Sequence, residues 1–146
     1  MLTKTQIELI QESFRKIAPR KDSFADAFYG NLFSRQPALR ILFPENLDEQ
    51  KKKLMQMLSA AVNLLDKTEN LLPILEELGR RHALYGVRDE YYQPVGATLL
   101  QTLKESFGEA FDSETEKAWA AMYEFVSETM QKAALELSSA PNNNKS

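Results

Sequence analysis

Apolar residues recur every three or four positions along most of this chain, the spacing that gathers side chains on one face of a helix. The first such stretch begins at Thr3, because a hydroxyl residue followed three positions later by Gln6 forms a capping-box pattern. It continues to Pro19 through the apolar positions Ile7, Ile10, Phe14 and Ile17. No segment shows the sustained alternation of apolar and polar residues that marks a strand, so we predict an all-α fold.

Short polar loops separate the next helical stretches. An aromatic-rich helix follows the turn at residues 19–22, and a short helix over residues 38–42 ends before Pro44, because a residue preceding proline disfavours helical angles. Asn46 or Asp48 is expected to cap the helix after it. The buried side of that helix is expected to contain Leu54, Met57, Leu58, Ala61 and Leu65.

The second half of the chain repeats the same pattern. A helix over residues 71–84 is expected to end at Gly86, which accepts a left-handed conformation readily. Asp89 is expected to cap a further helix, and Ser113 with Glu116 forms a capping box for the last long one. About seven helices are therefore predicted in all.

Length and composition limit the classes of protein that the chain can represent. Its 146 residues predict one domain, over residues 1–137, followed by a disordered polar tail over residues 138–146 with little apolar surface to bury. The net charge of −3, with acidic and basic residues interspersed, argues against a nucleic-acid partner. No apolar run approaches the length of a membrane span or a signal core, and exposed apolar residues are scattered, so we expect a cytoplasmic monomer.

Cysteine is absent and histidine occurs once, at position 82. The chain therefore has no disulfide, no thiolate metal site and no thioether attachment of haem. One histidine, without any cysteine, is too few for a zinc site formed only by protein side chains. The chain also has no second histidine that could act as the base for a serine nucleophile. Most carboxylates fall at helix ends or on polar faces, where solvation and helix-dipole roles are typical. No catalytic residue can be named from this pattern.

His82 is the exception, because Leu71, Leu75, Leu78 and His82 follow one another at helical spacing on an apolar stripe. An imidazole on such a face needs a buried hydrogen-bond partner, or it can act as the neutral ligand of a metal. A haem iron requires only one protein ligand of this kind. The pattern alone leaves both alternatives open.

Several spaced motifs together resemble the globin family. They are the segment from Phe28 to Phe33, Pro37 with Leu42 and Phe43, Gln50 with Leu54, the segment from Leu78 to His82, and Tyr92 with Val95 and Gly96. The chain looks similar to bacterial single-domain globins related to neuroglobin, of the thermoglobin or Hell's Gate globin type, and more distantly to the haem domain of flavohaemoglobins. This resemblance implies a globin fold, a three-on-three helical sandwich without a clear D helix, that holds iron in a non-covalent haem b.

On the proximal side of the haem, the resemblance implies His82 as the iron ligand and Phe43 as an aromatic wedge against the porphyrin. Val87 and Tyr92 would contact the cofactor there. Tyr92 matches the tyrosine that orients the ligand histidine in flavohaemoglobins. The glutamate that completes their arrangement falls near Ala134, so strong electron donation to the iron is in doubt unless Glu136 substitutes for it. Two cations, Arg81 and Lys53, are expected either to pair with haem propionates or to remain free in solvent.

On the distal side, Tyr29 and Gln50 stand where related globins place polar residues, and Phe28 and Leu54 would form an apolar wall. A phenol and an amide donor in a dry pocket stabilise dioxygen, whose outer atom is partly negative, by about 1 to 1.5 kcal/mol each. Together they would slow ligand release roughly ten- to a hundredfold. The bis-histidine haem of neuroglobin cannot form within a chain that has one histidine, so we expect ferrous iron open to ligands, with Tyr29 or water as alternatives in the ferric state.

Four functions are compatible with these residues. The first is reversible binding or transport of dioxygen, with nitric oxide, carbon monoxide and sulfide as further ligands. The second is an enzyme, a nitric oxide dioxygenase that requires an electron-donating reductase. The third is a gas sensor that acts through a partner, and the fourth is a haem-free helical regulator in which His82 is a core residue.

Overall fold

The computed structural model describes residues 2–139, and these residues form only helices and connecting turns. The six α-helices are α1 (Lys4–Ile17), α2 (Lys21–Arg35), α3 (Asp48–Asn63), α4 (Thr68–Leu84), α5 (Tyr92–Phe107) and α6 (Ser113–Ser139). Four 3-10 helices join them, η1 (Ala18–Arg20), η2 (Pro37–Leu42), η3 (Asp89–Tyr91) and η4 (Gly108–Ala110). The all-α prediction is confirmed. Residues 140–146 of the expected tail lie outside the described residues, and the tail remains a prediction.

Several helix boundaries follow from the local chemistry that the sequence indicates. The capping box at α1 forms, because the Gln6 amide N–H donates to the Thr3 hydroxyl over 3.1 Å and the Gln6 side chain accepts from the Thr3 N–H over 3.0 Å. At the start of α3 the N-cap residue is Leu47, which makes no side-chain cap bond, so neither Asn46 nor Asp48 caps the helix as predicted. The Asn46 side-chain oxygen instead accepts from the Asp48 N–H over 2.9 Å in the turn before the helix. Gly86 has a φ of 93°, as the end of α4 requires.

Two further predicted caps are wrong. Asp89 begins the short helix η3, and α5 starts only at Tyr92. At α6 the side chain of Asp112, and not that of Ser113, accepts from the Thr115 N–H over 2.8 Å. A carboxylate one residue earlier in the chain reaches the free amides of the first turn, so the capping residue moves by one position.

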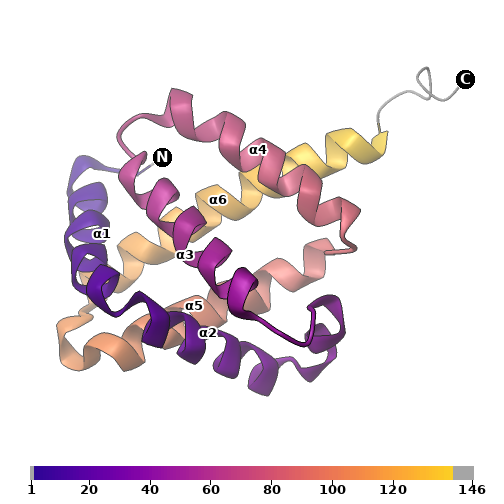
Figure 1. Ribbon diagram of the computed structural model, residues 1–146. Helices are drawn as coiled ribbons and strands as arrows, with labels where there is room; N and C mark the ends of the chain where they lie inside the picture. The colour runs from indigo at the N-terminus through magenta and orange to yellow at the C-terminus, as the bar shows by residue number, and fades with distance from the viewer. Residues whose placement is uncertain (1, 140–146) are drawn as a thin grey trace, which may run out of the picture.

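The helices pack in crossed pairs, with α4 across α6, α2 along α5, and α1 against α6 (Figure 1). α3 packs against α1 and α2 on the side that faces the viewer in Figure 1. The crossing of α4 and α6 is close at Gly79, where an added Cβ would lie 2.3 Å from the backbone oxygen of Met130. Because only glycine fits there, the crossing fixes the position of the helix that carries His82.

The core lies between these pairs and is anchored by Trp119, which is fully buried and donates from its indole N–H to the Ser13 hydroxyl over 2.8 Å. The predicted core side of α3 is confirmed in part, because Leu58 and Ala61, and Leu65 just after the helix, are buried. Leu54 and Met57, also predicted there, are only half-buried, and Met55 and Val62 are buried instead. The core side is therefore shifted towards Met55 and Val62, on a helix that packs against α1 and α2. Within residues 2–139, no helix combines the length and apolar character needed to cross a membrane.

Candidate functional site

The last turn of α4 holds the imidazole of His82 in one orientation. Its Nδ1–H donates to the carbonyl oxygen of Leu78, one turn earlier, over 2.9 Å. This bond leaves Nε2 without the proton, as in a metal-binding imidazole. Burial lowers the pKa of His82 below its ordinary 6.5, although the bond to Leu78 acts in the opposite direction. The imidazole is therefore neutral at pH 7 and has a lone pair on Nε2.

The chain after His82 turns sharply and stays close to it. The Val87 N–H donates to the His82 carbonyl over 3.0 Å, which closes the corner between α4 and η3. The Val87 side chain is half-buried and packs against the core. Arg81 points away from this corner, because its guanidinium donates to the Glu77 carboxylate over 3.1 Å and is 63% exposed. Lys53, on α3, is exposed.

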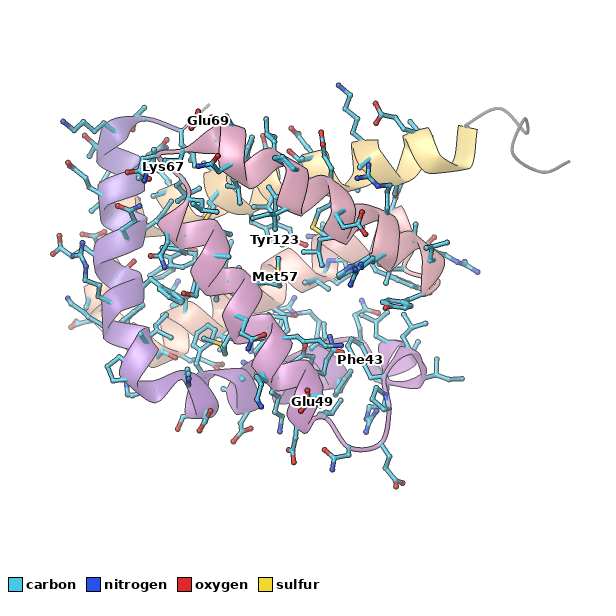
Figure 2. All side chains as sticks on the ribbon, turned by 45° about the horizontal axis from the view of Figure 1, so that its top comes forward. Phe43, Glu49, Met57, Lys67, Glu69 and Tyr123 are labelled. Carbon is cyan, nitrogen blue, oxygen red and sulfur yellow. The ribbon has the colours of Figure 1, made fainter. Side chains whose placement is uncertain are left out.

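A cluster of four aromatic rings lies on α2 and at the corner after η2. Tyr29 on α2 is its centre, with ring centroids 5.1 Å from Phe28, 5.9 Å from Phe33 and 5.7 Å from Phe43. Phe33 and Phe43 are in turn 5.4 Å apart at 69°. Figure 2 shows Phe43 at the corner that leads from η2 towards α3. The edge-to-face pairs favour one position for the tyrosine ring.

The Tyr29 phenol is buried and has Gln50 as its polar neighbour. Burial raises the pKa of Tyr29 to about 12, and a side-chain hydrogen bond with Gln50 acts against this rise. The Gln50 side chain can either donate to the phenol oxygen or accept from the phenol hydroxyl, because an amide carries both kinds of group. Gln50 comes from the first turns of α3, whereas Tyr29 comes from α2. The fold therefore brings together two polar residues that the sequence separates.

The residues present fit a haem. The macrocycle needs an apolar slot, one neutral imidazole for iron and few polar groups near the iron. The structure supplies a neutral imidazole in His82, half-buried Leu54 and Val87, the Phe43 ring, and a Tyr29–Gln50 pair from separate helices. In the described part of the chain, no three His, Cys, Asp or Glu side chains gather in a way that could hold a metal ion by themselves.

Tyr92 and Tyr123 form a second buried pair that sequence reasoning identified only in part. The Tyr123 hydroxyl donates to the Tyr92 carbonyl over 2.5 Å, and the Tyr123 ring fills the notch at Gly96. Figure 2 places Tyr123 behind α3 and α4. Burial raises the pKa of Tyr92 to about 12, and the nearby charge of Asp89 adds to the rise. Burial likewise raises the pKa of Tyr123.

The group that accepts the hydrogen bond from His82 Nδ1 is a backbone carbonyl and not a carboxylate. Glu136, which could substitute for the missing glutamate, is exposed, and Ala134 is half-buried. A carboxylate acceptor would make the imidazole more electron-donating than a carbonyl does. The backbone acceptor therefore makes the His82 imidazole less electron-donating than a carboxylate acceptor would.

Comparisons with known proteins agree with this geometry. A sequence profile of the globin family matches residues 26–130. A neuroglobin from Danio rerio is 32% identical over 136 residues, which is 84% of this chain and 86% of the neuroglobin. A flavohemoprotein from Vibrio cholerae is 29% identical over 133 residues, 88% of this chain, but the chain spans only 33% of that protein's length. A bacterial globin from Campylobacter jejuni has a similar structure, with a TM-score of 0.83, 25% identity and coverage of 93% of this chain and 99% of that one.

Proposed function

Because the chain belongs to the globin family, we propose that it binds a non-covalent haem b through His82 and uses it to hold dioxygen and other small gases reversibly. The haem, when bound, supplies an iron with one open coordination position. His82 would hold the iron on one side. Phe43, Leu54 and Val87 would pack against the macrocycle, and Tyr92 would contact it on the side of His82.

The observation that carries this proposal is the state of His82. A histidine that is only a core residue needs both ring nitrogens satisfied by neighbours or water. In this chain Nδ1 donates to the Leu78 carbonyl, and Nε2 has no protein partner among the described residues but keeps accessible surface, since no buried side-chain nitrogen or oxygen there lacks a hydrogen bond. A neutral imidazole with an accessible Nε2 lone pair can bind a metal.

Tyr29 and Gln50 would act on the bound gas. The phenol is protonated throughout the neutral range, because burial raises its pKa to about 12, so it can donate a hydrogen bond to a partly negative ligand atom. Gln50, the polar neighbour of the phenol, would offer a second side-chain N–H donor to the gas. The rings around Tyr29, of which Phe28 is buried and Phe33 and Phe43 are half-buried, would limit the access of water and so strengthen each of these bonds.

The experiment is reconstitution of the purified chain with haem, followed by cycles of oxygenation and deoxygenation of the reduced protein. We expect a stoichiometric complex whose visible spectrum changes reversibly with dioxygen over several cycles. Absence of a Soret band after reconstitution would contradict haem binding. Immediate oxidation of the iron in every cycle would contradict reversible oxygen binding while leaving haem binding intact.

A nitric oxide dioxygenase is the second candidate, as the resemblance to the haem domain of flavohaemoglobins suggests. The name of the flavohemoprotein relatives implies that flavin and haem occur in one protein, and the chain spans about a third of the Vibrio cholerae protein. Such an activity in this chain needs an electron-donating reductase partner to restore ferrous iron after each cycle. Nitrate formed per haem distinguishes the two functions. More than one nitrate per haem with a flavoprotein reductase and nicotinamide present supports the enzyme, whereas one or none supports the binding protein.

A further inference from the structure

Arg40 makes an unusual set of contacts at the corner between η2 and α3. Its Nη1 donates to the carbonyl oxygens of Phe43, over 3.2 Å, and Pro44, over 2.9 Å. Its Nη2 donates to the carbonyl of Glu45 over 2.9 Å. One guanidinium therefore binds three consecutive backbone carbonyls. This is a use to which the planar fork of arginine is suited and the single ammonium of lysine is not.

The same guanidinium also contacts the aromatic cluster. Its central carbon lies 5.2 Å from the centroid of the Phe33 ring, within range of a cation–π interaction. Phe33 is one of the rings that touch Tyr29, and Phe43, whose carbonyl Arg40 binds, is another. Arg40 therefore contacts the ring of one residue that packs against Tyr29 and the backbone of another.

The corner also leads directly into the helix that carries Gln50. Residues 43–47 join η2 to α3, and the first turn of α3 begins at Asp48. This connection contains Pro44, which has no N–H to donate, so backbone bonding within the corner is limited. The bonds from Arg40 fix the path of the chain there, and with it the position of the Gln50 amide that contacts Tyr29.

We propose that Arg40 is a positioning residue for Tyr29, because it fixes the corner that supplies both the Phe43 ring and the Gln50 amide around the phenol. Arg40 itself need not touch a bound gas. It would set how tightly the gas is held by keeping the phenol hydroxyl aimed into the site. This inference rests on the proposed role of Tyr29 as hydrogen-bond donor, and it adds the residue that controls that donor.

The test combines Arg40→Met with Tyr29→Phe in a double-mutant cycle, using the full chain reconstituted with haem. The readout is the rate constant of dioxygen dissociation. We expect Arg40→Met to accelerate dissociation about three- to tenfold in the wild-type background and less than about twofold in the Tyr29→Phe background, because the lost positioning has nothing left to act on. Equal factors in the two backgrounds would overturn the proposal.

Two further readouts do not depend on dioxygen. The C–O stretching frequency of the carbon monoxide complex reports the polarity around the bound gas, and Arg40→Met should shift it towards the value of Tyr29→Phe. Hydrogen exchange in the haem-free chain should accelerate at the amides of residues 43–51. An unchanged stretching frequency or unchanged exchange in this segment would count against Arg40 as the positioning residue.

Arg35→Met is the matched control, because Arg35 lies on α2 with Tyr29 but donates to the Gln101 side chain on α5 over 2.7 Å. It should leave dioxygen dissociation unchanged. If Arg40→Met does not fold, Arg40→Lys is the alternative variant, because it keeps the positive charge and disrupts the corner less. It should accelerate dioxygen dissociation by a smaller factor than Arg40→Met. If Tyr29→Phe alone leaves dissociation unchanged, the proposed role of Tyr29 fails; if only the Arg40 variants leave it unchanged, the inference about Arg40 fails alone.

Discussion

Replacing Tyr29 by phenylalanine removes one hydroxyl from the proposed gas site and leaves the packing around it intact. The ring is 4% exposed and is held between Phe28, Phe33 and Phe43, and phenylalanine fills the same space in that cluster. The substitution therefore tests the hydrogen bond and not the fold. We expect the free energy of unfolding of the haem-free chain to change by less than about 1 kcal/mol.

The size of the effect on ligand release follows from the state of the phenol. Because burial raises the pKa of Tyr29 to about 12, the hydroxyl is a full donor at pH 7. A hydrogen bond to a partly negative ligand atom contributes about 1.5 kcal/mol, and each 1.4 kcal/mol corresponds to about a factor of ten. Tyr29→Phe should thus release dioxygen about tenfold faster.

Stopped-flow displacement of dioxygen by carbon monoxide measures this rate directly. Tyr123→Phe is the matched control, because it removes another buried phenol hydroxyl, one that donates to the Tyr92 carbonyl from α6. That control should leave the dissociation rate within about twofold of wild type. A rate in Tyr29→Phe equal to wild type would refute the assignment of Tyr29 as the donor to the bound gas.

Three further outcomes follow from the same coordinates. The rate of dioxygen dissociation, measured by stopped flow, should be constant from pH 7 to 10. An ordinary tyrosine of pKa 10.0 would be half ionised at pH 10, whereas Tyr29, with a pKa of about 12, would stay protonated. A rise in the rate centred near pH 10 would contradict this. In urea titrations, Gly79→Ala should lower the free energy of unfolding by about 1 to 3 kcal/mol, because the added Cβ would meet the backbone of Met130. Gly30→Ala should raise it by up to about 1 kcal/mol, because the space around Gly30 is open and alanine favours a helix more than glycine does. Burial lowers the pKa of His82, so the folded chain binds a proton there less readily than the unfolded chain. In urea titrations of the haem-free chain, the free energy of unfolding should reach its full value above pH 6.5 and fall below that pH by at most about 1.4 kcal/mol per pH unit. His82→Gln should abolish this pH-dependent component.

Periodicity was sufficient to predict helices and the burial of Leu58 and Ala61 on α3 and of Leu65 just after it, but not which neighbouring residues complete the core side of that helix. Residues 54–65 are apolar on nearly every side, so the stripe that includes Leu54 and Met57 and the one that includes Met55 and Val62 are equally plausible in sequence. Packing against α1 and α2 selects the second. Leu54 and Met57 keep accessible surface, and the proposed haem site needs this surface.

The candidate site, too, could be predicted from the sequence only in part. His82 could be singled out because it is the only histidine and lies on an apolar stripe, and resemblance to globins supplied the proposed roles of Tyr29 and Gln50. Nothing local in the sequence marks Arg40, because its partners are backbone carbonyls that gather only when the chain turns at residues 43–45. Tyr123 was likewise hidden, since its partner Tyr92 lies 31 residues away on another helix.

The optical spectrum of the reduced, ligand-free protein tests the role of His82 most directly when wild type is compared with His82→Gly. We predict that wild type shows one broad Soret band of five-coordinate high-spin iron. The His82→Gly protein should lose this band shape and regain it when free imidazole is added, because imidazole can occupy the space left by the side chain. Sharp, split low-spin bands in wild type would contradict the open coordination position. A spectrum of His82→Gly identical to wild type without imidazole would contradict iron ligation by His82.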